Sequence, residues 1–217
     1  MAGKTDSEIE QELFAAVAAS RGHFVYESGH HGDLWLEFDR LFFETEHAHR
    51  FVAMLGERTH SLRPDTICGP LVGGAFVAHT LAAQTHRRFA FSEPRMQPDG
   101  TAEYVIPPGL QSRLANARVL VVDDVMNAGS AVRMTADALR KCGATLVGFG
   151  ALMALGNVGP LLREEYGVPF TALSVTERRL WEPHLCVLCE HGVPITDDQD
   201  AVTGLLSDSE LGPRRIR

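Results

Sequence analysis

The stretch VLVVDDVMNAGSA, residues 119–131, decides the fold class of this chain. Four consecutive apolar β-formers predict a strand over residues 119–124 that is buried on both faces, as in a parallel sheet. Asp123 and Asp124 end this strand, a loop of small residues follows, and a helix is predicted over residues 131–142. In an open parallel sheet the ligand crevice lies at the carboxyl ends of the strands. The segment therefore predicts a binding site at that edge.

The residues of the loop suit a phosphate beside a polyol. Gly129 allows the backbone to approach a ligand closely, and the start of the helix offers free N–H groups and a positive dipole end. Asn127 and Ser130 add side-chain donors. The two carboxylates would repel that phosphate, so they suit ribose hydroxyls or a Mg²⁺ ion held through water. The structural alternative is a strand–turn–helix with two surface aspartates, one of which caps the helix.

The rest of the chain repeats the alternation of strands and helices. This pattern indicates an α/β domain with a mostly parallel central sheet flanked by helices. Further strands are predicted over residues 65–70, 88–94, 144–155 and 169–175, and further helices over residues 46–61, 75–86 and 158–167. The polar, Gly- and Pro-rich residues 96–111 predict a long surface loop with a short hairpin strand.

The two ends of the chain depart from this alternation. A helix is predicted over residues 7–20, and two short strands within residues 23–38. Residues 1–45 and 177–196 are expected to form a small cap near the carboxyl ends of the strands. Together with the body they make a single domain over residues 1–196, followed by a mobile tail, residues 197–217.

A second glycine loop follows another predicted buried strand. In DTICGPLVGGA, residues 65–75, such a loop can present successive amides to an anion. By itself this segment is better interpreted as an ordinary βα turn. It lies about 50 residues before the acidic pair, with a helix, a strand and a long loop between them.

This pair of segments resembles the type I phosphoribosyltransferases. In that family the acidic pair holds the ribose hydroxyls of phosphoribosyl diphosphate (PRPP), the following loop holds its 5′-phosphate, and the earlier loop holds its diphosphate. The resemblance implies Mg²⁺ as cofactor and a PRPP site at Pro70, Leu71, Val72, Gly73, Gly74, Asp123, Asp124, Val125, Met126, Asn127, Ala128, Gly129, Ser130 and Ala131.

The N-terminal segment narrows the resemblance. GHFVYESGHHGDLWLEFDRLF, residues 22–42, is similar to the opening of the orotate phosphoribosyltransferases, and the likeness extends over roughly residues 8–195. In those enzymes a serine–glycine loop helps to hold the base, which implicates Ser28, Gly29 and His30. A plain hairpin turn is the alternative. The implied activity is transfer of ribose 5-phosphate to a pyrimidine-type base, a step of pyrimidine nucleotide biosynthesis.

Two departures from the orotate enzymes bear on activity. Asn127 and Ala128 stand where those enzymes commonly have hydroxyl residues. Those enzymes also carry lysines on a loop that closes over the diphosphate, often from the neighbouring subunit of a homodimer. The matching residues 92–105 contain no lysine, and Arg95 is their only cation. Arginine can pair with a phosphate, so Arg95 is the candidate clamp. The alternatives are a PRPP or nucleotide sensor without activity and a transferase for another base.

Composition limits the partners. The net charge of −8 argues against nucleic acid as a partner. No apolar run approaches the roughly 18 residues of a membrane span, and the polar N-terminus resembles no signal peptide. We therefore expect a cytoplasmic protein with small-molecule substrates.

The cysteines raise one further question. Cys68 and Cys142 are expected to be buried thiols. Cys186 and Cys189 form a CxxC pair between His184 and His191, a set that can hold Zn²⁺. Because this segment is too short to wrap one ion easily, a structural role in the cap is favoured.

Overall fold

The chain is described by a computed structural model over residues 5–26, 29–98 and 102–196. Its helices are α1 (Asp6–Ala16), α2 (Phe38–Phe43), α3 (Thr45–Thr59), α4 (Gly73–Thr85), α5 (Pro108–Leu114), α6 (Ser130–Lys141), α7 (Val158–Tyr166) and α8 (Val187–Glu190), with 3₁₀ turns at His60–Leu62 and Pro183–Leu185. Its strands are β1 (Ser20–Val25), β2 (His31–Trp35), β3 (Thr66–Pro70), β4 (Arg88–Met96), β5 (Ala102–Val105), β6 (Arg118–Met126), β7 (Thr145–Leu155), β8 (Phe170–Thr176) and β9 (Leu180–Trp181).

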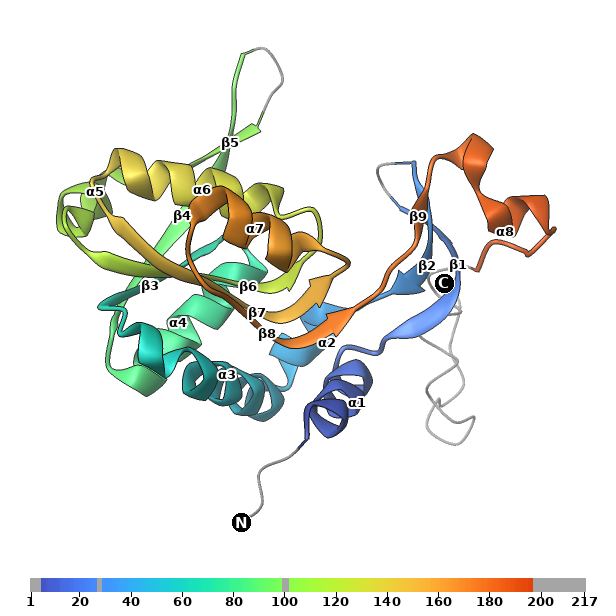
Figure 1. Cartoon of the computed structure of the whole chain (residues 1–217), viewed down its shortest axis with the longest axis horizontal. Helices are drawn as coiled ribbons and strands as arrows, with labels where there is room; N and C mark the ends of the chain where they lie inside the picture. Colours follow the sequence, from blue (N-terminus) through green and yellow to red (C-terminus); the bar gives the residue numbers. More distant parts are fainter. Residues whose placement is uncertain (1–4, 27–28, 99–101, 197–217) are drawn as a thin grey trace, which may run out of the picture.

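A six-stranded sheet forms the body, in the order β5-β4-β3-β6-β7-β8 (Figure 1). The pairs from β4 across to β8 are parallel. β5 is antiparallel and forms a hairpin with β4. The predicted mostly parallel sheet is confirmed, and so is the short hairpin strand within the predicted loop.

Helices cover both faces of this sheet. Apolar side chains of β6 point alternately to the two faces, so each face needs a helical layer to bury them. Leu120 and Val122 belong to a core with the apolar side chains of α1, α2, α3 and α4. Val119 and Val121 belong to the opposite core, with α6 and α7. Because successive side chains of a strand point to opposite faces, an all-apolar β6 is buried between two helical layers.

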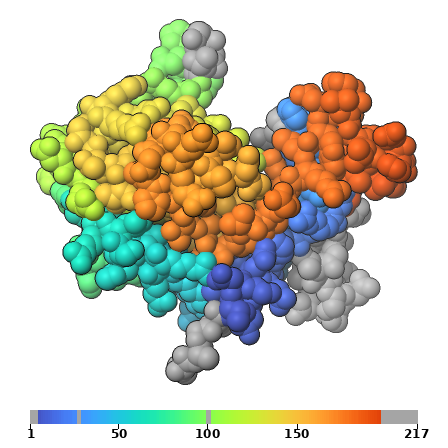
Figure 2. All heavy atoms as spheres, in the orientation of Figure 1, coloured from blue at the N-terminus to red at the C-terminus, as the bar shows by residue number. Residues whose placement is uncertain are grey.

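The cap is a three-stranded sheet in the order β1-β2-β9, and it joins the two ends of the described chain. β2 pairs antiparallel with both β1 and β9. Figure 1 places this sheet beside the carboxyl ends of β6, β7 and β8. Figure 2 shows the surface hollowed between the cap and the α6–α7 side of the body. The small cap expected from the two ends of the chain is therefore present as β1, β2 and β9, whereas α1 and α2, within the predicted cap residues 1–45, pack on the body.

Three local predictions need correction. The first helix ends at Ala16, because the chain turns through Val17 and a positive φ at Ala18 before β1 begins. The predicted loop 96–111 contains the start of α5, whose Pro108 occupies the first helical turn, where proline is well tolerated. Cys68 is buried as expected, whereas Cys142 is only partly buried.

Two further predictions concern membrane-spanning helices and the C-terminal tail. Among the described residues, no helix has both the length and the apolar character that a membrane crossing requires. The predicted tail, residues 197–217, lies outside the described residues.

Candidate active site at the switch point of the sheet

The two loops singled out in the sequence lie side by side. β3 and β6 are neighbours in the sheet, and the chain runs outward from β3 to β4 on one side and from β6 to β7 on the other. A reversal of this kind opens a crevice beyond the carboxyl ends of the two strands. Residues 71–74 follow β3, and residues 127–129 follow β6, so both loops border the same crevice.

Gly73 and Gly74, in the loop after β3, lie against the carboxylates of Asp123 and Asp124 near the end of β6. A Cβ atom on Gly73 would lie 2.1 Å from Oδ2 of Asp124. A Cβ atom on Gly74 would lie 2.6 Å from Oδ1 of Asp123 and 2.7 Å from Cδ of Pro70. No side chain fits in either place. The glycines are therefore what allows the loop after β3 to pass against the acidic pair. The Leu71–Val72 peptide in this loop is cis.

The acidic pair is held in an environment that disfavours two negative charges. Burial raises the pKa of Asp123 well above its ordinary value, and the charge of Asp124 raises it further. Burial likewise raises the pKa of Asp124, and Asp39 at the start of α2 adds a further like charge. The backbone N–H of Asp124 donates to Asp123 Oδ1 at 3.1 Å. Hydroxyl donors or a hydrated cation would relieve this repulsion.

The loop after β6 leads directly into α6. Gly129 has φ +76 and precedes the first helical residue, Ser130. A positive φ is costly for other residues, so glycine is suited to this turn. Gly129 is buried, whereas the side chains of Asn127 and Ser130 are exposed at the crevice end of the helix. The first turn of α6 thus directs its free N–H groups toward the crevice.

Arg133 on α6 holds the loop after β6 in place. Its guanidinium donates to the carbonyl oxygen of Ala128 and pairs with Glu165 at 2.6 Å. Its charge is therefore committed within the described structure. Met126 is 1% exposed and belongs to the core, so only its backbone can face a ligand.

Comparison with known proteins identifies the family. The family model of the phosphoribosyl transferase domain matches residues 52–168, which include both loops. The chain belongs to the phosphoribosyltransferase family. An orotate phosphoribosyltransferase of Thermus thermophilus is 30% identical over 187 residues, covering 86% of this chain and 97% of that protein. The orotate phosphoribosyltransferase of Caldanaerobacter subterraneus subsp. tengcongensis is 28% identical over 191 residues, covering 88% and 95%.

A solved structure supports the fold. The orotate phosphoribosyltransferase from Aeropyrum pernix superimposes with a TM-score of 0.62 at 23% identity, covering 78% of this chain and 92% of that one. The expected type I phosphoribosyltransferase fold is therefore confirmed, and the chain is a phosphoribosyltransferase by family.

The cap of this phosphoribosyltransferase contributes a hairpin tip beside the crevice. Tyr26 and His30 close the tip through a backbone hydrogen bond of 2.9 Å, and Gly29 lies between them with φ +77. His30 Nε2 lies 3.3 Å from Glu182 Oε1 in the segment after β9. Ser28, the remaining candidate, lies outside the described residues.

Arg178 connects this hairpin with the loop after β6. Its guanidinium donates to Asn127 Oδ1 at 2.6 Å and lies 5.2 Å from the ring centroid of Tyr26. The Tyr26 ring stacks in turn on Trp35, with 5° between the ring planes. Arg178 therefore places a positive charge between the hairpin tip of the cap and the loop after β6.

Arg95 lies apart from these residues. It stands on β4 opposite Glu103 of β5, is exposed, and has Glu93 Oε1 at 4.0 Å. Figure 1 shows the β4–β5 hairpin projecting from the body. Tyr104, one residue further along β5, is close enough to Asp123 for that charge to add to burial in raising the pKa of the tyrosine. The hairpin therefore reaches the crevice through Tyr104 rather than Arg95.

The sequence did not point to Arg178, Tyr26 or Tyr104. Arg178 carried a usable signal, because it follows β8 closely and the ends of parallel strands gather at one edge of a sheet. Tyr26 and Tyr104 carried none, because both lie in hairpins whose position relative to the body depends on tertiary packing.

The two cysteines of the C-terminal segment lie beside different histidines from those that neighbour them in the sequence. Cys186 and Cys189 lie beside His23 and His31 of the first cap strands. His184 and His191, their neighbours in sequence, are exposed and do not join this group among the described residues. The four-residue set His184, Cys186, Cys189 and His191 is therefore not assembled.

Proposed function

We propose that this phosphoribosyltransferase transfers ribose 5-phosphate from PRPP to a pyrimidine-type base, with release of diphosphate. The observation that carries the proposal is the contact of Gly73 and Gly74 with the carboxylates of Asp124 and Asp123. It joins a loop suited to diphosphate and an acidic pair suited to ribose in one crevice. In PRPP the diphosphate lies close to the ribose hydroxyls. A protein that binds both must therefore bring the diphosphate loop and the acidic pair together, as this chain does.

Each part of PRPP has a matching part of the crevice. Asp123 and Asp124 accept hydrogen bonds from the ribose hydroxyls, or hold Mg²⁺ through its water. The N–H groups at the start of α6, with Asn127, Gly129 and Ser130, hold the 5′-phosphate. The loop Pro70–Gly74 holds the diphosphate. Residues 125, 126, 128 and 131 contribute through their backbone.

Mg²⁺ suits the acidic pair, because partly buried carboxylates with raised pKa values gain from a hard cation. When bound, it neutralises charge on the diphosphate and on the carboxylates. A ring nitrogen of the base then forms a bond to C1 of the ribose and loses its proton to water or to the departing diphosphate, while the bond from C1 to the diphosphate oxygen breaks and its electron pair leaves with diphosphate. Stabilisation of that leaving charge is the main catalytic requirement. We propose that Arg95 supplies it when the β4–β5 hairpin closes, from its own subunit or from a partner.

The base is proposed to lie between the hairpin tip, with Ser28, Gly29 and His30, and Arg178. A carboxylate-bearing pyrimidine such as orotate would meet the Arg178 guanidinium, which already lies between the tip and Asn127. Arginine is well suited to bind a planar carboxylate through two parallel hydrogen bonds. The orotate enzymes among the similar proteins agree with this choice.

A homodimer is proposed as the working form. Next to the diphosphate loop, α2, α3, α4 and β4 surround an apolar pocket of about 570 Å³, lined in part by Phe42, Leu71, Phe76, Phe89 and Phe91. Phe43 and Val72 nearby are 84% and 62% exposed. Large apolar side chains gathered at one surface are typical of a subunit interface.

A second function rests on two departures from the orotate enzymes. Residues 92–105 have no lysine, and Asn127 and Ala128 replace hydroxyl residues. These departures favour a sensor that binds PRPP or a nucleotide without turnover. We place it second, because departure of the diphosphate requires a charge clamp rather than a lysine as such. A transferase for another base, such as a purine, is the third possibility.

Turnover with a panel of bases distinguishes these functions. The full chain is incubated with PRPP and Mg²⁺ plus orotate, uracil, adenine or hypoxanthine, and diphosphate release is measured. The proposal expects release with orotate or uracil, and none in the Asp124→Asn variant. Release with a purine alone would support the third function. Saturable PRPP binding without release on any base would support the sensor.

A further inference from the structure

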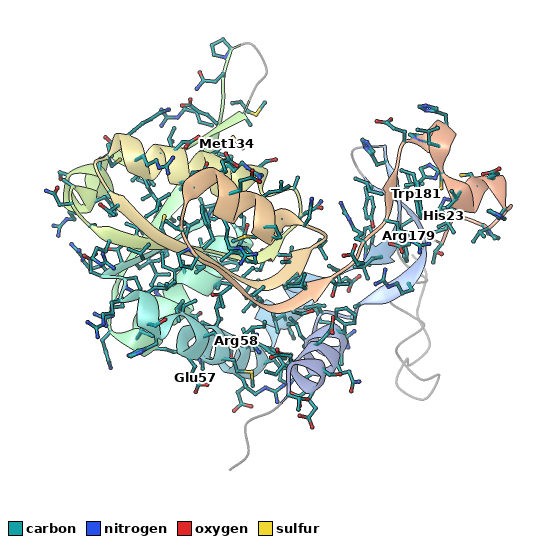
Figure 3. The ribbon with its side chains drawn as sticks, viewed as in Figure 1. His23, Glu57, Arg58, Met134, Arg179 and Trp181 are labelled. Carbon is teal, nitrogen blue, oxygen red and sulfur yellow. The ribbon has the colours of Figure 1, made fainter. Side chains whose placement is uncertain are left out.

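Four metal-ligating side chains from distant parts of the sequence meet in the cap. His23 lies on β1, His31 on β2, Cys186 immediately before α8, and Cys189 within α8. One ligand atom from each lies within 4.8 Å of all the others. Figure 1 shows β1, β2 and α8 gathered in the cap, and Figure 3 labels His23 there, well away from the body of the protein. The group is therefore separate from the acidic pair and the phosphate loop, while His31 directly follows His30 of the proposed base-binding tip.

The separations of the ligand atoms fit a tetrahedral ion. His23 Nε2 lies 3.5 Å from Cys186 Sγ and 3.7 Å from Cys189 Sγ. His31 Nδ1 lies 3.3 Å from Cys189 Sγ and 2.8 Å from His23 Nε2. Zinc bonds of about 2.0–2.1 Å to nitrogen and about 2.3 Å to sulfur require N–S separations of about 3.5 Å and N–N separations of about 3.3 Å. The two separations from His23 Nε2 to sulfur are close to this value, and that from His31 Nδ1 to Cys189 Sγ is slightly shorter. The two histidine nitrogens lie at hydrogen-bonding distance, closer than the zinc geometry by roughly half an ångström.

The histidine on β1 is oriented as a ligand. Its Nδ1 lies 2.8 Å from the carbonyl oxygen of Val193, so Nδ1–H donates there and the lone pair of Nε2 faces the group. A second hydrogen bond of this kind fixes the tautomer of most metal-bound histidines. His23 is 1% exposed and Cys186 is 3% exposed. Water therefore has little access to these two ligands.

The C-terminal part of the cap has little else to hold it. Among residues 183–196, Cys186 alone is buried, and Leu185 and Ile195 are 62% and 58% exposed. The backbone of Thr196 bonds to His23 at 2.7 Å, and the thiols reach the two histidines. A segment without an apolar core of its own is commonly stabilised by a disulfide or a metal ion. Two thiols facing two imidazoles favour the metal.

We propose that His23, His31, Cys186 and Cys189 bind a structural Zn²⁺ ion, which fastens residues 183–196 to the β1–β2 hairpin. Two thiolates and two imidazoles in tetrahedral arrangement favour zinc over magnesium, calcium or manganese. All four positions are taken by protein, as in structural rather than catalytic sites. Binding ionises both thiols and releases their protons. His23 and His31 bracket the hairpin tip, so the ion also fixes its direction.

Metal analysis of the full chain tests this proposal. The protein is expressed with a removable tag in zinc-supplemented medium, purified without chelator, and measured by plasma mass spectrometry. About one Zn²⁺ per chain is expected. Cys189→Ser and His23→Ala are expected to lose it, whereas His184→Ala, His191→Ala and Cys142→Ser are expected to keep it. Loss in the His184 and His191 variants with retention in His23→Ala would overturn the proposed ligand set.

Cobalt binding keeps the test decisive if a ligand variant fails to fold. Wild-type protein is stripped with a chelator under reducing conditions and titrated with Co²⁺. Intense visible d–d bands of tetrahedral cobalt, with thiolate-to-cobalt charge transfer, are expected to saturate at about one equivalent. Weak bands typical of octahedral cobalt would contradict the proposal. A purified chain that holds no zinc and carries a Cys186–Cys189 disulfide by intact mass would also overturn it.

Discussion

Gly73 and Asp124 are in such close contact that a Cβ atom on the glycine would lie 2.1 Å from Oδ2 of the aspartate. This contact joins the loop after β3 to the strand β6 across the switch point of the sheet. It explains why a glycine and an acid more than 50 residues apart belong to one site. It also makes the site sensitive to one methyl group.

Gly73→Ala is therefore expected to weaken PRPP binding at least about tenfold, equivalent to about 1.4 kcal/mol. The new methyl group must displace either the Asp124 carboxylate or the diphosphate loop. Thermal stability should change little, because alanine favours the helix that begins here by up to about 1 kcal/mol. Calorimetric titration with PRPP measures the effect. Gly109→Ala is the matched control, since a Cβ atom at Gly109 on α5 would have nothing within 4 Å; equal losses in both variants would contradict this explanation.

Asp123→Asn is expected to stabilise the folded protein at neutral pH while abolishing transfer. Because the pKa of Asp123 is raised in the folded state, the native carboxyl is favoured in its protonated form. Its contribution to stability is present below the ordinary value of 3.8 and is lost as pH rises through the folded pKa. The amide mimics the neutral form, so the variant should melt a few degrees higher at pH 7, where about 1 kcal/mol corresponds to roughly 2–4 °C.

Calorimetric melting at pH 7 and near pH 4 measures this difference, which should shrink at the lower pH. Glu57→Gln is the control, because Glu57 is an exposed carboxylate on α3 (Figure 3). Mg²⁺ should stabilise the wild type more than Asp123→Asn. A melting temperature of Asp123→Asn below the wild type at pH 7 would show that the acidic pair is not under strain.

Arg178→Ala is expected to raise the KM for orotate at least about tenfold and to leave the Kd of PRPP within about threefold. Its guanidinium lies between Asn127 and the Tyr26 ring, where a base carboxylate would enter. Arg178→Lys should recover only part of the loss, because lysine cannot bind a carboxylate through two parallel bonds. Steady-state kinetics with each substrate varied gives both constants. Arg179→Ala is the control, since Arg179 is exposed and its backbone N–H, which bonds Asp33, remains; a purely PRPP-directed defect in Arg178→Ala would refute the base role.

Arg95→Ala is expected to lower kcat at least about tenfold, with a smaller effect on PRPP affinity, because the clamp acts on the leaving charge. If the clamp closes onto the partner of a homodimer, inactive Arg95→Ala and Asp124→Asn chains should restore each other after mixing and refolding. Random pairing would recover up to about a quarter of the wild-type activity. Light scattering gives the mass of the assembly. A dimer without recovery would place the clamp within its own subunit, and unchanged kcat in Arg95→Ala would remove it from catalysis.

Much of the body was predictable, because its elements depend on local patterns. The apolar run in β6 and the glycines after β3 and β6 indicated the sheet, the two loops and the crevice between them. The approach of Gly73 to Asp124 was not predictable, since it depends on how β3 and β6 pair. The same is true of Arg178, which reaches Asn127 only because β8 and β6 end at one edge of the sheet.

The cap shows the limit more clearly. The spacing of Cys186 and Cys189 suggested a metal, but their sequence neighbours His184 and His191 were the wrong partners. The histidines that face the thiols are His23 and His31, more than 150 residues away. Such a pairing follows from the three-stranded sheet that joins the two ends of the described chain. It cannot be predicted from residues that are close together in the sequence.

The most direct test of the proposed function is a calorimetric titration of the full chain with PRPP in the presence of Mg²⁺. Saturable binding at about one PRPP per chain is expected, weaker by at least about tenfold without Mg²⁺ and absent in Asp124→Asn. The absence of binding heat and of any thermal shift at millimolar PRPP with Mg²⁺ would contradict the assignment of this crevice to ribose, phosphate and diphosphate.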